Sequence, residues 1–302
     1  MIDLCILGTG GSIPMPDRAL SSLYIRHAGR GILVDCGEGT QIQIMKLGWG
    51  FRCIDTVLLT HYHADHCSGL PGFLLAQAKA EREEPLDIYG PVGLSHVIAG
   101  LRVIAPQLPY ELSLHELRKN PCEFSADGLQ ITAFPLNHGI PCMGYDFRLN
   151  RLPRFLPEKA SALHIPVQAW KLLQHGETVE INGTTFSPDQ VMGGLRTGIH
   201  FLFATDTRPV PEISEYGAQS DLMILEGMYG EDEKTDLALK NRHMLFSEAA
   251  HAALASGARR LLLTHFSTSM EDPSLFLPYA SSIFPGTECA EDLMVTHLDY
   301  PE

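Results

Sequence analysis

Four side chains that can bind a metal ion fall within six consecutive residues of this chain, His61-Tyr62-His63-Ala64-Asp65-His66. They directly follow Thr56-Val57-Leu58-Leu59-Thr60, a β-branched and apolar run that is typical of a buried β-strand. On the extended tip after such a strand, the first two histidines can point at one ion. The aspartate and the last histidine, further round the turn, can point at a second. A lone histidine is commonly structural, but this spacing predicts a metal site.

Further ligands must come from elsewhere in the chain, and sheet proteins collect such residues at the carboxyl ends of their strands. His138, Asp206 and His265 each follow an apolar run that predicts a strand. Taken one at a time, each could equally be a structural residue. Together with the cluster they make seven ligands. That number is enough for two borderline ions such as zinc, with a bridging carboxylate and an open position for water.

The elements that must position these side chains alternate between strands and helices. Short β-branched or leucine-rich runs predict strands at 3–7, 22–27, 31–35, 56–60, 86–89, 130–135, 144–149, 200–205, 221–225 and 260–264. Helical patterns lie between them, at 41–47, 70–83, 93–104, 246–256 and 274–283. The alternation predicts an α/β layered fold.

The composition is that of a globular protein. The chain has 302 residues, of which 45% are hydrophobic and 19% charged, and its formal net charge is −14. These values exclude a disordered tail, a collagen-like repeat and a coiled coil, and they argue against gripping nucleic acid with the whole surface. Residues 147–175 depart from this balance, because they carry five basic residues and one acid. This segment is interpreted either as a projecting arm with a binding role or as a solvated connector.

Seven cysteines are scattered along the chain without a Cys-x-x-Cys pair, and several lie inside apolar runs. Buried, reduced thiols in a reducing compartment are the simplest interpretation. The first residues show no basic region followed by an apolar stretch and a cleavage site. No run of about 18 apolar residues occurs, so no membrane span is predicted. We therefore expect a cytoplasmic protein.

The H-x-H-x-D-H loop, with later His, Asp and His residues at strand ends, resembles the metallo-β-lactamase superfamily. Gly8-Thr9-Gly10-Gly11 and Asp35-Cys36-Gly37-Glu38-Gly39-Thr40-Gln41 resemble, more closely, the ribonuclease Z family of tRNA 3′-processing endonucleases. The order of these motifs matches that family from Leu4 to about His265. The resemblance implies a single metallo-β-lactamase domain over residues 1–302, folded as an αββα four-layer sandwich. It also implies an inserted projecting arm that binds substrate, at about residues 151–194.

The resemblance also assigns roles to individual side chains. Seven would bind two zinc ions: His61, His63 and His138 the first, Asp65, His66 and His265 the second, and Asp206 both. Asp65 would also be a catalytic residue, the general base that orients or deprotonates the attacking water. His243 would be the other catalytic residue, touching the scissile phosphate or protonating the leaving oxygen. Asp35 would fix a ligand histidine through a hydrogen bond. Without the resemblance, Asp35 and His243 could each be structural.

Three substrate-recognition features of the family are altered. The P-x-K-x-R-N loop reads Pro14-Met15-Pro16-Asp17-Arg18-Ala19, which keeps the proline and the arginine but lacks the lysine and the asparagine. The family's His-Ser-Thr or His-Glu-Ala-Thr loop keeps only its histidine, and the arm has no Gly-Pro pair. The side chains that remain as candidates for substrate binding are Arg18, Arg151, Arg154, Lys159 and Lys171. Trp170 in the arm could stack on a base or act as a packing anchor.

The resemblance implies a metal-dependent endoribonuclease that hydrolyses the phosphodiester at the 3′ end of precursor tRNA and releases the 3′ trailer. It implies two Zn²⁺ per subunit, with Mn²⁺ as an alternative, and a homodimer in which one subunit's arm serves the other's active site. The altered loops keep a second hypothesis open, in which the same centre hydrolyses a different RNA or a small phosphodiester. A catalytically silent scaffold is a third hypothesis. It predicts the loss of at least one ligand, and all seven are present.

Overall fold

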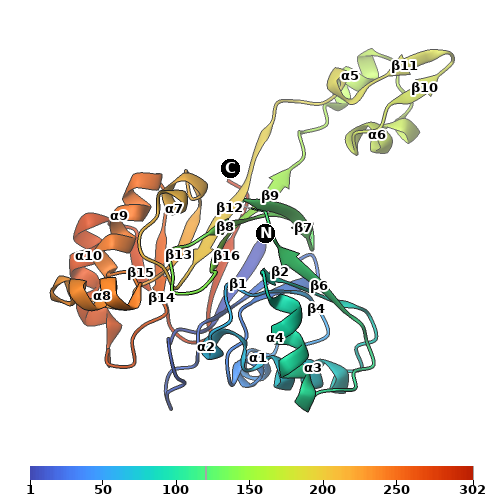
Figure 1. Cartoon of the computed structure of the whole chain (residues 1–302). Helices are drawn as coiled ribbons and strands as arrows, with labels where there is room; N and C mark the ends of the chain where they lie inside the picture. The colour runs from blue at the N-terminus through green and yellow to red at the C-terminus, as the bar shows by residue number, and fades with distance from the viewer. Residues whose placement is uncertain (120, 302) are drawn as a thin grey trace. The chain divides into compact units, whose positions relative to one another are not determined.

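The computed structural model describes residues 1–119 and 121–301 and separates into two compact units (Figure 1). The larger unit, Met1–Leu149 with Ile199–Asp299, contains every predicted metal ligand. The smaller unit consists of residues 150–198 and 300–301. Among these described residues, no helix is both long and apolar enough to cross a membrane.

The first sheet of the larger unit leads into the predicted His61–His66 loop. Within the described residues it has seven strands, in the spatial order β16 (Met294–Leu298), β1 (Ile2–Gly8), β2 (Ser22–His27), β3 (Arg30–Val34), β4 (Ile54–Leu58), β5 (Leu86–Pro91) and β6 (Leu112–Leu117). β3 and β4 are parallel, with Val34 paired to Leu58. The residues that follow these two strands therefore emerge at the same edge of the sheet.

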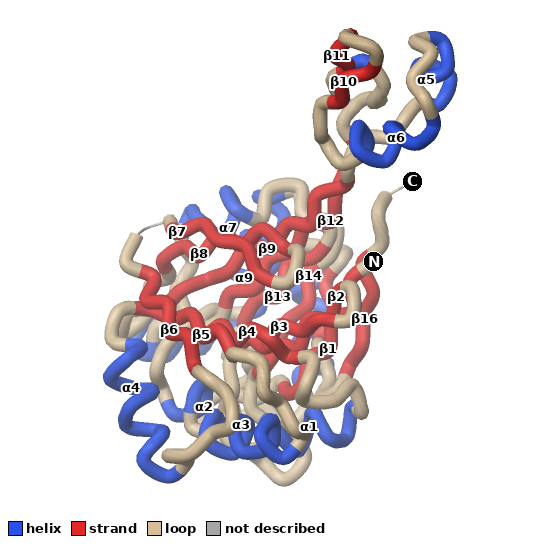
Figure 2. Tube along the Cα trace, turned by 90° about the vertical axis from the view of Figure 1, so that its right-hand side faces the viewer, coloured by secondary structure: helices blue, strands red, loops and turns tan. Residues whose placement is uncertain are grey.

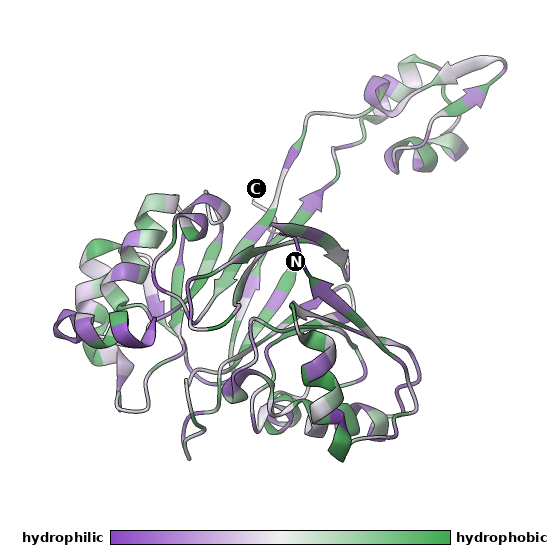
Figure 3. Ribbon diagram, in the orientation of Figure 1, coloured by the Kyte–Doolittle hydropathy of each residue, from purple (hydrophilic) through white to green (hydrophobic). Residues whose placement is uncertain are grey.

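The second sheet supplies the remaining predicted ligands. Its seven described strands follow the spatial order β15 (Thr287–Cys289), β14 (Leu261–Thr264), β13 (Leu222–Glu226), β12 (Arg196–Ala204), β9 (Met143–Arg151), β8 (Leu129–Pro135) and β7 (Cys122–Ala126). β12, β13 and β14 are parallel neighbours, with Ala204 paired to Leu225 and Glu226 paired to Thr264. Three strands thus end side by side at one edge. β13 and β14 are buried along their whole length, and β12 is buried over its last four residues (Figure 3).

Helices cover the outer face of each sheet (Figures 1 and 2). The helices of this unit are α1 (Thr40–Leu47), α2 (Ala64–Cys67), α3 (Leu70–Lys79), α4 (Leu94–Leu101), α7 (Pro211–Tyr216), α8 (Thr235–Asn241), α9 (Phe246–Ser256) and α10 (Leu277–Ile283), with the 3₁₀ turns η1 (Arg102–Ile104), η3 (Asp232–Lys234) and η4 (Pro273–Phe276). Phe73 of α3 belongs to the core under the first sheet, and Ala249 of α9 belongs to the core under the second. The two sheets and the two helical layers form the αββα sandwich that the resemblance implies.

The predicted strands and helices are of the same type as the observed ones, but several of them differ in where they begin or end. Strand 22–27 and helix 246–256 match in both bounds, whereas the helix predicted at 70–83 ends at Lys79. The pattern does not predict β6, β7, β15 and β16, and these are the edge strands of the two sheets. Edge strands are half-exposed, so their residues show only a weak hydrophobic alternation.

The smaller unit has a hydrophobic core of its own, with Ala160, Ile165, Leu173, Val179 and Val191 buried. Its elements are α5 (Pro157–Ala162), α6 (Val167–Gln174), β10 (Val179–Ile181), β11 (Thr184–Phe186) and the 3₁₀ turn η2 (Pro188–Gln190). The ring of Trp170 packs 5.3 Å from that of Phe155, and its Nε1 donates to the carbonyl oxygen of Ile165 at 2.9 Å. Trp170 is therefore a packing anchor of this unit.

Candidate metal centre

The strand ends of the larger unit bring all seven predicted ligands together. Four groups of three side chains have potential ligand atoms that lie within 4.8 Å of one another. They are His61, His63 and His138; His61, His66 and Asp206; Asp65, His66 and His265; and Asp206, His243 and His265. Loops from both sheets contribute, since the cluster 61–66 follows β4, while His138, Asp206 and His265 follow β8, β12 and β14.

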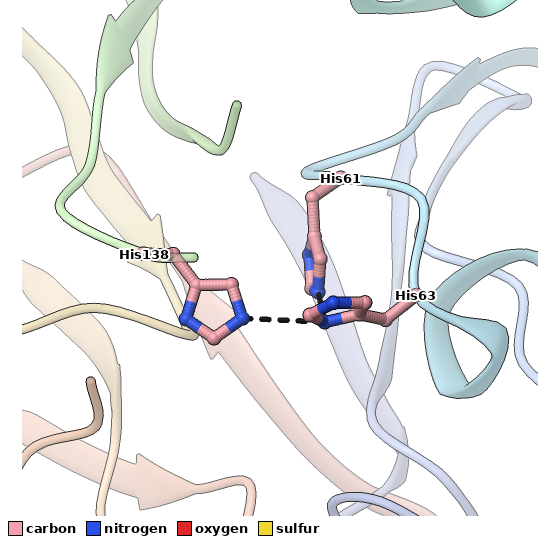
Figure 4. A group of neighbouring side chains, drawn as sticks. All are labelled: His61, His63 and His138. Atoms are coloured by element: carbon pink, nitrogen blue, oxygen red, sulfur yellow. Dashed lines mark hydrogen bonds between the residues drawn. The ribbon is translucent and has the colours of Figure 1, made fainter. Parts of the chain in front are cut away.

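The first group consists of three histidines whose ring nitrogens face one another (Figure 4). Nδ1 of His63 lies 3.0 Å from Nε2 of His61 and 3.2 Å from Nε2 of His138. On its far side, Nδ1 of His138 lies 3.3 Å from the carbonyl oxygen of Arg242, which can only accept a hydrogen bond. His138 therefore carries its proton on Nδ1, and the lone pair of its Nε2 points into the group.

Thr60 decides the tautomer of His61 in the same way. Its hydroxyl donates to the carboxylate of Asp35 at 2.8 Å, so its oxygen accepts from Nδ1 of His61 at 3.0 Å. The lone pair of Nε2 of His61 then also faces His63. Inward-facing lone pairs repel one another unless a cation lies between them, and neutral imidazole is the form that binds metals.

The second group pairs a carboxylate with two histidines. Nε2 of His66 lies 3.2 Å from Nε2 of His265 and 3.5 Å from Oδ2 of Asp65. Nδ1 of His66 donates to Oδ2 of Asp35 at 2.7 Å, which leaves Nε2 free to bind a metal. Asp35 thus makes a hydrogen bond with His66, one of the predicted ligand histidines.

Asp206 lies between the two groups and turns one carboxylate oxygen toward each. Its Oδ1 is 3.9 Å from Nε2 of His61 and 4.0 Å from Nε2 of His138. Its Oδ2 is 3.1 Å from Nε2 of His66 and 3.2 Å from Nε2 of His265. Asp206 is buried, and among the described residues its Oδ2 accepts no hydrogen bond of normal geometry. A carboxylate placed in this way could be shared by two ions, one in each group.

The electrostatics of the site also fit divalent cations. Asp35, Asp206 and Glu226 are buried carboxylates, and a buried negative charge is costly unless positive charge compensates it. Burial lowers the pKa of His61 to about 2, and it also lowers the pKa of His138. Both rings are therefore neutral at physiological pH, as metal ligands must be.

His243 lies beside the ligands, and its ring is held by an acid that sequence reasoning missed. Nδ1 of His243 is 2.9 Å from Oε2 of Glu226, whose other oxygen accepts from the backbone N–H of Thr207 at 2.5 Å. Burial opposes protonation of His243, but the charges of Glu226 and Asp206 raise its pKa to about 9. Glu226 ends an apolar run, so the strand-end rule that selected Asp206 could also have found it.

A second missed residue is Ser12, whose backbone N–H donates to Oδ2 of Asp65 at 2.7 Å. Ser12 has a φ of 73°, in the left-handed region that residues other than glycine rarely adopt. The strained turn therefore aims an N–H group at the carboxylate that the resemblance makes the general base. A serine inside a glycine-rich segment gives no local signal of this contact.

The candidate substrate-binding residues belong to both units, with Arg18 in the larger one and the other four in the smaller one. Arg18 donates to the carbonyl oxygens of Ser267 and Glu271, at 3.3 and 3.0 Å, and so holds the loop that follows His265. It also borders a cavity of about 460 Å³ between residues 14–19 and α1. Arg151 lies over the ring of Tyr300 within the smaller unit. The other three, Arg154, Lys159 and Lys171, are exposed on that unit.

Comparisons with known proteins agree with this geometry. Residues 15–213 match the family model of the metallo-β-lactamase superfamily, and residues 164–266 match that of a β-lactamase superfamily domain. A protein of Lachnospira eligens named Ribonuclease Z is 45% identical over 302 residues, covering 100% of this chain and 99% of its own. The Ribonuclease Z of Lachnoclostridium phytofermentans is 44% identical over 300 residues, which are 99% of either chain.

The chain belongs to the ribonuclease Z family.

Among solved structures, the short form of human tRNase Z is similar to this chain with a TM-score of 0.69 and 25% identity. The match covers 99% of this chain and 100% of the human chain. Ribonuclease Z relatives and this chain therefore correspond over their whole lengths, the segment between residues 150 and 198 included.

Proposed function

We propose that this protein is a metal-dependent endoribonuclease of the ribonuclease Z type, which cleaves precursor tRNA at its 3′ end and releases the 3′ trailer. The observation that carries the proposal is Asp206, with one oxygen toward each of two ligand groups. Family membership, at 44–45% identity over nearly the whole chain, supports the choice of substrate.

The metal centre is proposed to hold two zinc ions, with Mn²⁺ as the alternative. The ligands would be His61, His63 and His138 for the first ion, Asp65, His66 and His265 for the second, and Asp206 for both. When bound, such ions lower the pKa of a water molecule and neutralise the charge that develops on the phosphate. The nitrogen- and oxygen-rich donor set suits borderline divalent ions of this kind.

The protein's own side chains would then handle the protons. Asp65, oriented by the N–H of Ser12, would accept a proton from the attacking water. The water oxygen bonds to phosphorus, and the bond from phosphorus to the 3′ oxygen of the tRNA breaks. His243 would give that leaving oxygen a proton from Nε2, because its Nδ1 is engaged by Glu226. The products are a tRNA with a 3′-hydroxyl and a trailer with a 5′-phosphate.

The segment 151–194 is proposed to be the arm that binds the tRNA. Arg154, Lys159 and Lys171 are exposed there and could contact phosphates without reading sequence. In a chain whose net charge is −14, a local basic surface is what RNA binding needs. We further propose a homodimer in the cytoplasm. The unpaired state of all seven cysteines is consistent with a reducing compartment.

An alternative function is hydrolysis of a different RNA or a small phosphodiester by the same centre. The observation that favours it is the loop from Pro14 to Ala19, where the family's lysine and asparagine are replaced by Pro16 and Ala19. Such a change would weaken contacts near the tRNA 3′ end while leaving the metal centre intact.

Cleavage of a 3′-extended precursor tRNA by the purified, zinc- or manganese-loaded protein tests the proposal, with the product ends mapped. The Asp65→Ala variant, which lacks the proposed general base, is the negative control. A cut just after the discriminator base that is absent with Asp65→Ala is the expected result. If the tRNA stays intact while an aryl phosphodiester is hydrolysed, the alternative function replaces the proposed one.

A further inference from the structure

His243 differs from the metal ligands in how the fold places it. The ligands follow strands whose positions the sheets determine, whereas His243 lies in the loop between α8 and α9. Its ring is held at Nδ1 by Glu226. The backbone N–H of His243 donates to the carbonyl oxygen of Ala238 at 3.0 Å, at the end of α8. The position of the carbonyl group of His243 depends on a further contact.

That contact comes from Arg208, in the loop that also carries Asp206. Nη1 of Arg208 donates to the backbone carbonyl oxygen of His243 at 2.5 Å. The same guanidinium forms a two-pronged ion pair with Glu248, in which Nη1 lies 2.9 Å from Oε2 and Nη2 bonds Oε1. Both side chains are mostly buried, and a bidentate pair of this kind is geometrically rigid.

Glu248 connects the pair to the start of α9. Its Oε2 accepts from the backbone N–H of Leu245 at 2.9 Å, two residues beyond His243. On the other side, the backbone N–H of Arg208 donates to the carbonyl oxygen of Asn137, which precedes the ligand His138. The Arg208–Glu248 pair thus joins three loops of the centre, those of His138, Asp206 and His243.

We propose that Arg208 and Glu248 are positioning residues for His243, and that they set the distance between its imidazole and the leaving oxygen. The inference rests on the proposed function, in which His243 protonates that oxygen. Neither residue touches the predicted ligand atoms. Their effect on the reaction is therefore expected to depend on how much the leaving group needs a proton.

Substrates with different leaving groups distinguish a positioning role of Arg208 and Glu248 from a merely structural one. The 3′ oxygen of a ribose is a poor leaving group that needs general acid catalysis, whereas a nitrophenolate leaves without a proton. Arg208→Lys keeps the positive charge but cannot form the fork to Glu248 and His243 together. Glu248→Gln removes the negative charge from the bidentate pair with Arg208 and so weakens it.

The experiment measures kcat and KM for a precursor tRNA and for bis(p-nitrophenyl) phosphate, in the wild type and in Arg208→Lys, Glu248→Gln and His243→Ala. Arg259→Lys is the matched control, since Arg259 forms an ion pair with Asp221 in the same half of the molecule. Bound zinc and the melting temperature are measured for every variant. We expect kcat on tRNA to fall about 10- to 100-fold in Arg208→Lys and Glu248→Gln, with KM and the aryl diester rate nearly unchanged.

The decisive comparison is between His243→Ala alone and the double variant that also carries Arg208→Lys. If Arg208 acts through His243, adding Arg208→Lys to His243→Ala lowers the tRNA rate no further. Equal losses on both substrates, no loss on tRNA, or additive losses in the double variant would overturn the proposal. Loss of zinc or of folding in both Arg208→Lys and Glu248→Gln would overturn it too, because the pair would then be structural. Failure of the proposed function is seen separately, since the wild type would leave the tRNA intact.

Discussion

Thr60 shows how a residue without a predicted role can decide the chemistry of its neighbours. Its hydroxyl lies between Asp35 and His61, and its backbone N–H also donates to Asp35 at 2.8 Å. The direction of one hydroxyl hydrogen therefore determines which nitrogen of His61 is free. The same carboxylate fixes His66, so Asp35 and Thr60 together orient one histidine of each ligand group.

Thr60→Val is expected to weaken zinc binding about 10- to 100-fold, because valine has the shape of threonine but cannot orient His61 or satisfy Asp35. A competition titration with a chromophoric chelator measures this affinity. Thr287→Val is the control, since Thr287 is buried with its hydroxyl bonded to the carbonyl oxygen of Phe284, away from the site. Unchanged zinc affinity in a folded Thr60→Val protein would contradict the role assigned to the hydroxyl.

Asp127 provides a pH-dependent prediction remote from the metal centre. Burial, and then the charge of Asp55, raises the pKa of its carboxyl, against bonds from Thr56 and Arg30. A carboxyl whose pKa is raised by folding stabilises the native state while it is protonated, and this contribution is lost as pH rises through the native pKa. At neutral pH the buried charge is a net cost.

Asp127→Asn is therefore expected to raise the melting temperature relative to wild type more at pH 7 than at pH 4. Asparagine also tolerates the left-handed backbone of this turn, where φ is 50°. Thermal unfolding at both pH values is the measurement, and the exposed Asp299→Asn is the control. An equal shift at pH 4 and pH 7 would show that the charge of Asp127 does not matter.

Two loops of the first sheet pack so closely that only glycine fits between them. The backbone N–H of Cys36 donates to the carbonyl oxygen of His66, and that of Gly69 donates to the carbonyl oxygen of Cys36. A Cβ at Gly69 would lie 1.9 Å from the carbonyl oxygen of Gly37, and one at Gly37 would lie 2.0 Å from that of Asp65. The Asp-Cys-Gly motif thus supports the loop that carries four of the predicted ligands, His61, His63, Asp65 and His66.

Gly69→Ala is expected to destabilise the fold by about 1–3 kcal/mol or more and to reduce the bound zinc, because the two loops must separate. Gly100→Ala is the matched control: a Cβ there meets no atom within 4 Å, and the change is expected to stay within about 1 kcal/mol. Chemical unfolding and zinc stoichiometry test both variants. Similar unfolding free energies for the two would refute the packing explanation.

At the scale of the whole molecule, the candidate metal ligands and the proposed tRNA-binding arm belong to different units. The larger unit holds every candidate ligand, and the smaller one has its own buried core. β9 and β12 are neighbours in one sheet, and the chain leaves the larger unit from one and returns on the other. The inserted segment can therefore be removed without breaking either sheet.

Replacing residues 153–194 with a short Gly-Ser turn is expected to leave aryl phosphodiester hydrolysis intact and to reduce tRNA cleavage roughly tenfold or more. The remaining activity should also depend less on salt, because phosphate contacts are lost. A second variant with Arg154→Glu, Lys159→Glu and Lys171→Glu keeps the shape of the unit and reverses its charge. Undiminished tRNA cleavage by both proteins would refute the arm's proposed role.

The sequence allows the most specific predictions where the signal is local. The ligand cluster and the strand-end residues could be selected because each follows a buried apolar run, and the structure brings them within reach of one another. The edge strands β6, β7, β15 and β16 were not predicted, because they are half-exposed and their residues show only a weak hydrophobic alternation. Glu226, Ser12 and Thr60 were missed because the partners that give them a role, His243, Asp65 and Asp35, lie between 17 and 53 residues away in the chain.

By itself the sequence determined the layered fold and the set of seven candidate ligands, since residue spacing and hydrophobic periodicity are properties of the chain alone. Only the tertiary structure decided which oxygen of Asp206 faces which group, which nitrogen of each histidine is free, and that Arg208 and Glu248 hold the backbone of His243. Those features are hydrogen bonds and distances across the two sheets, and a linear pattern does not encode them.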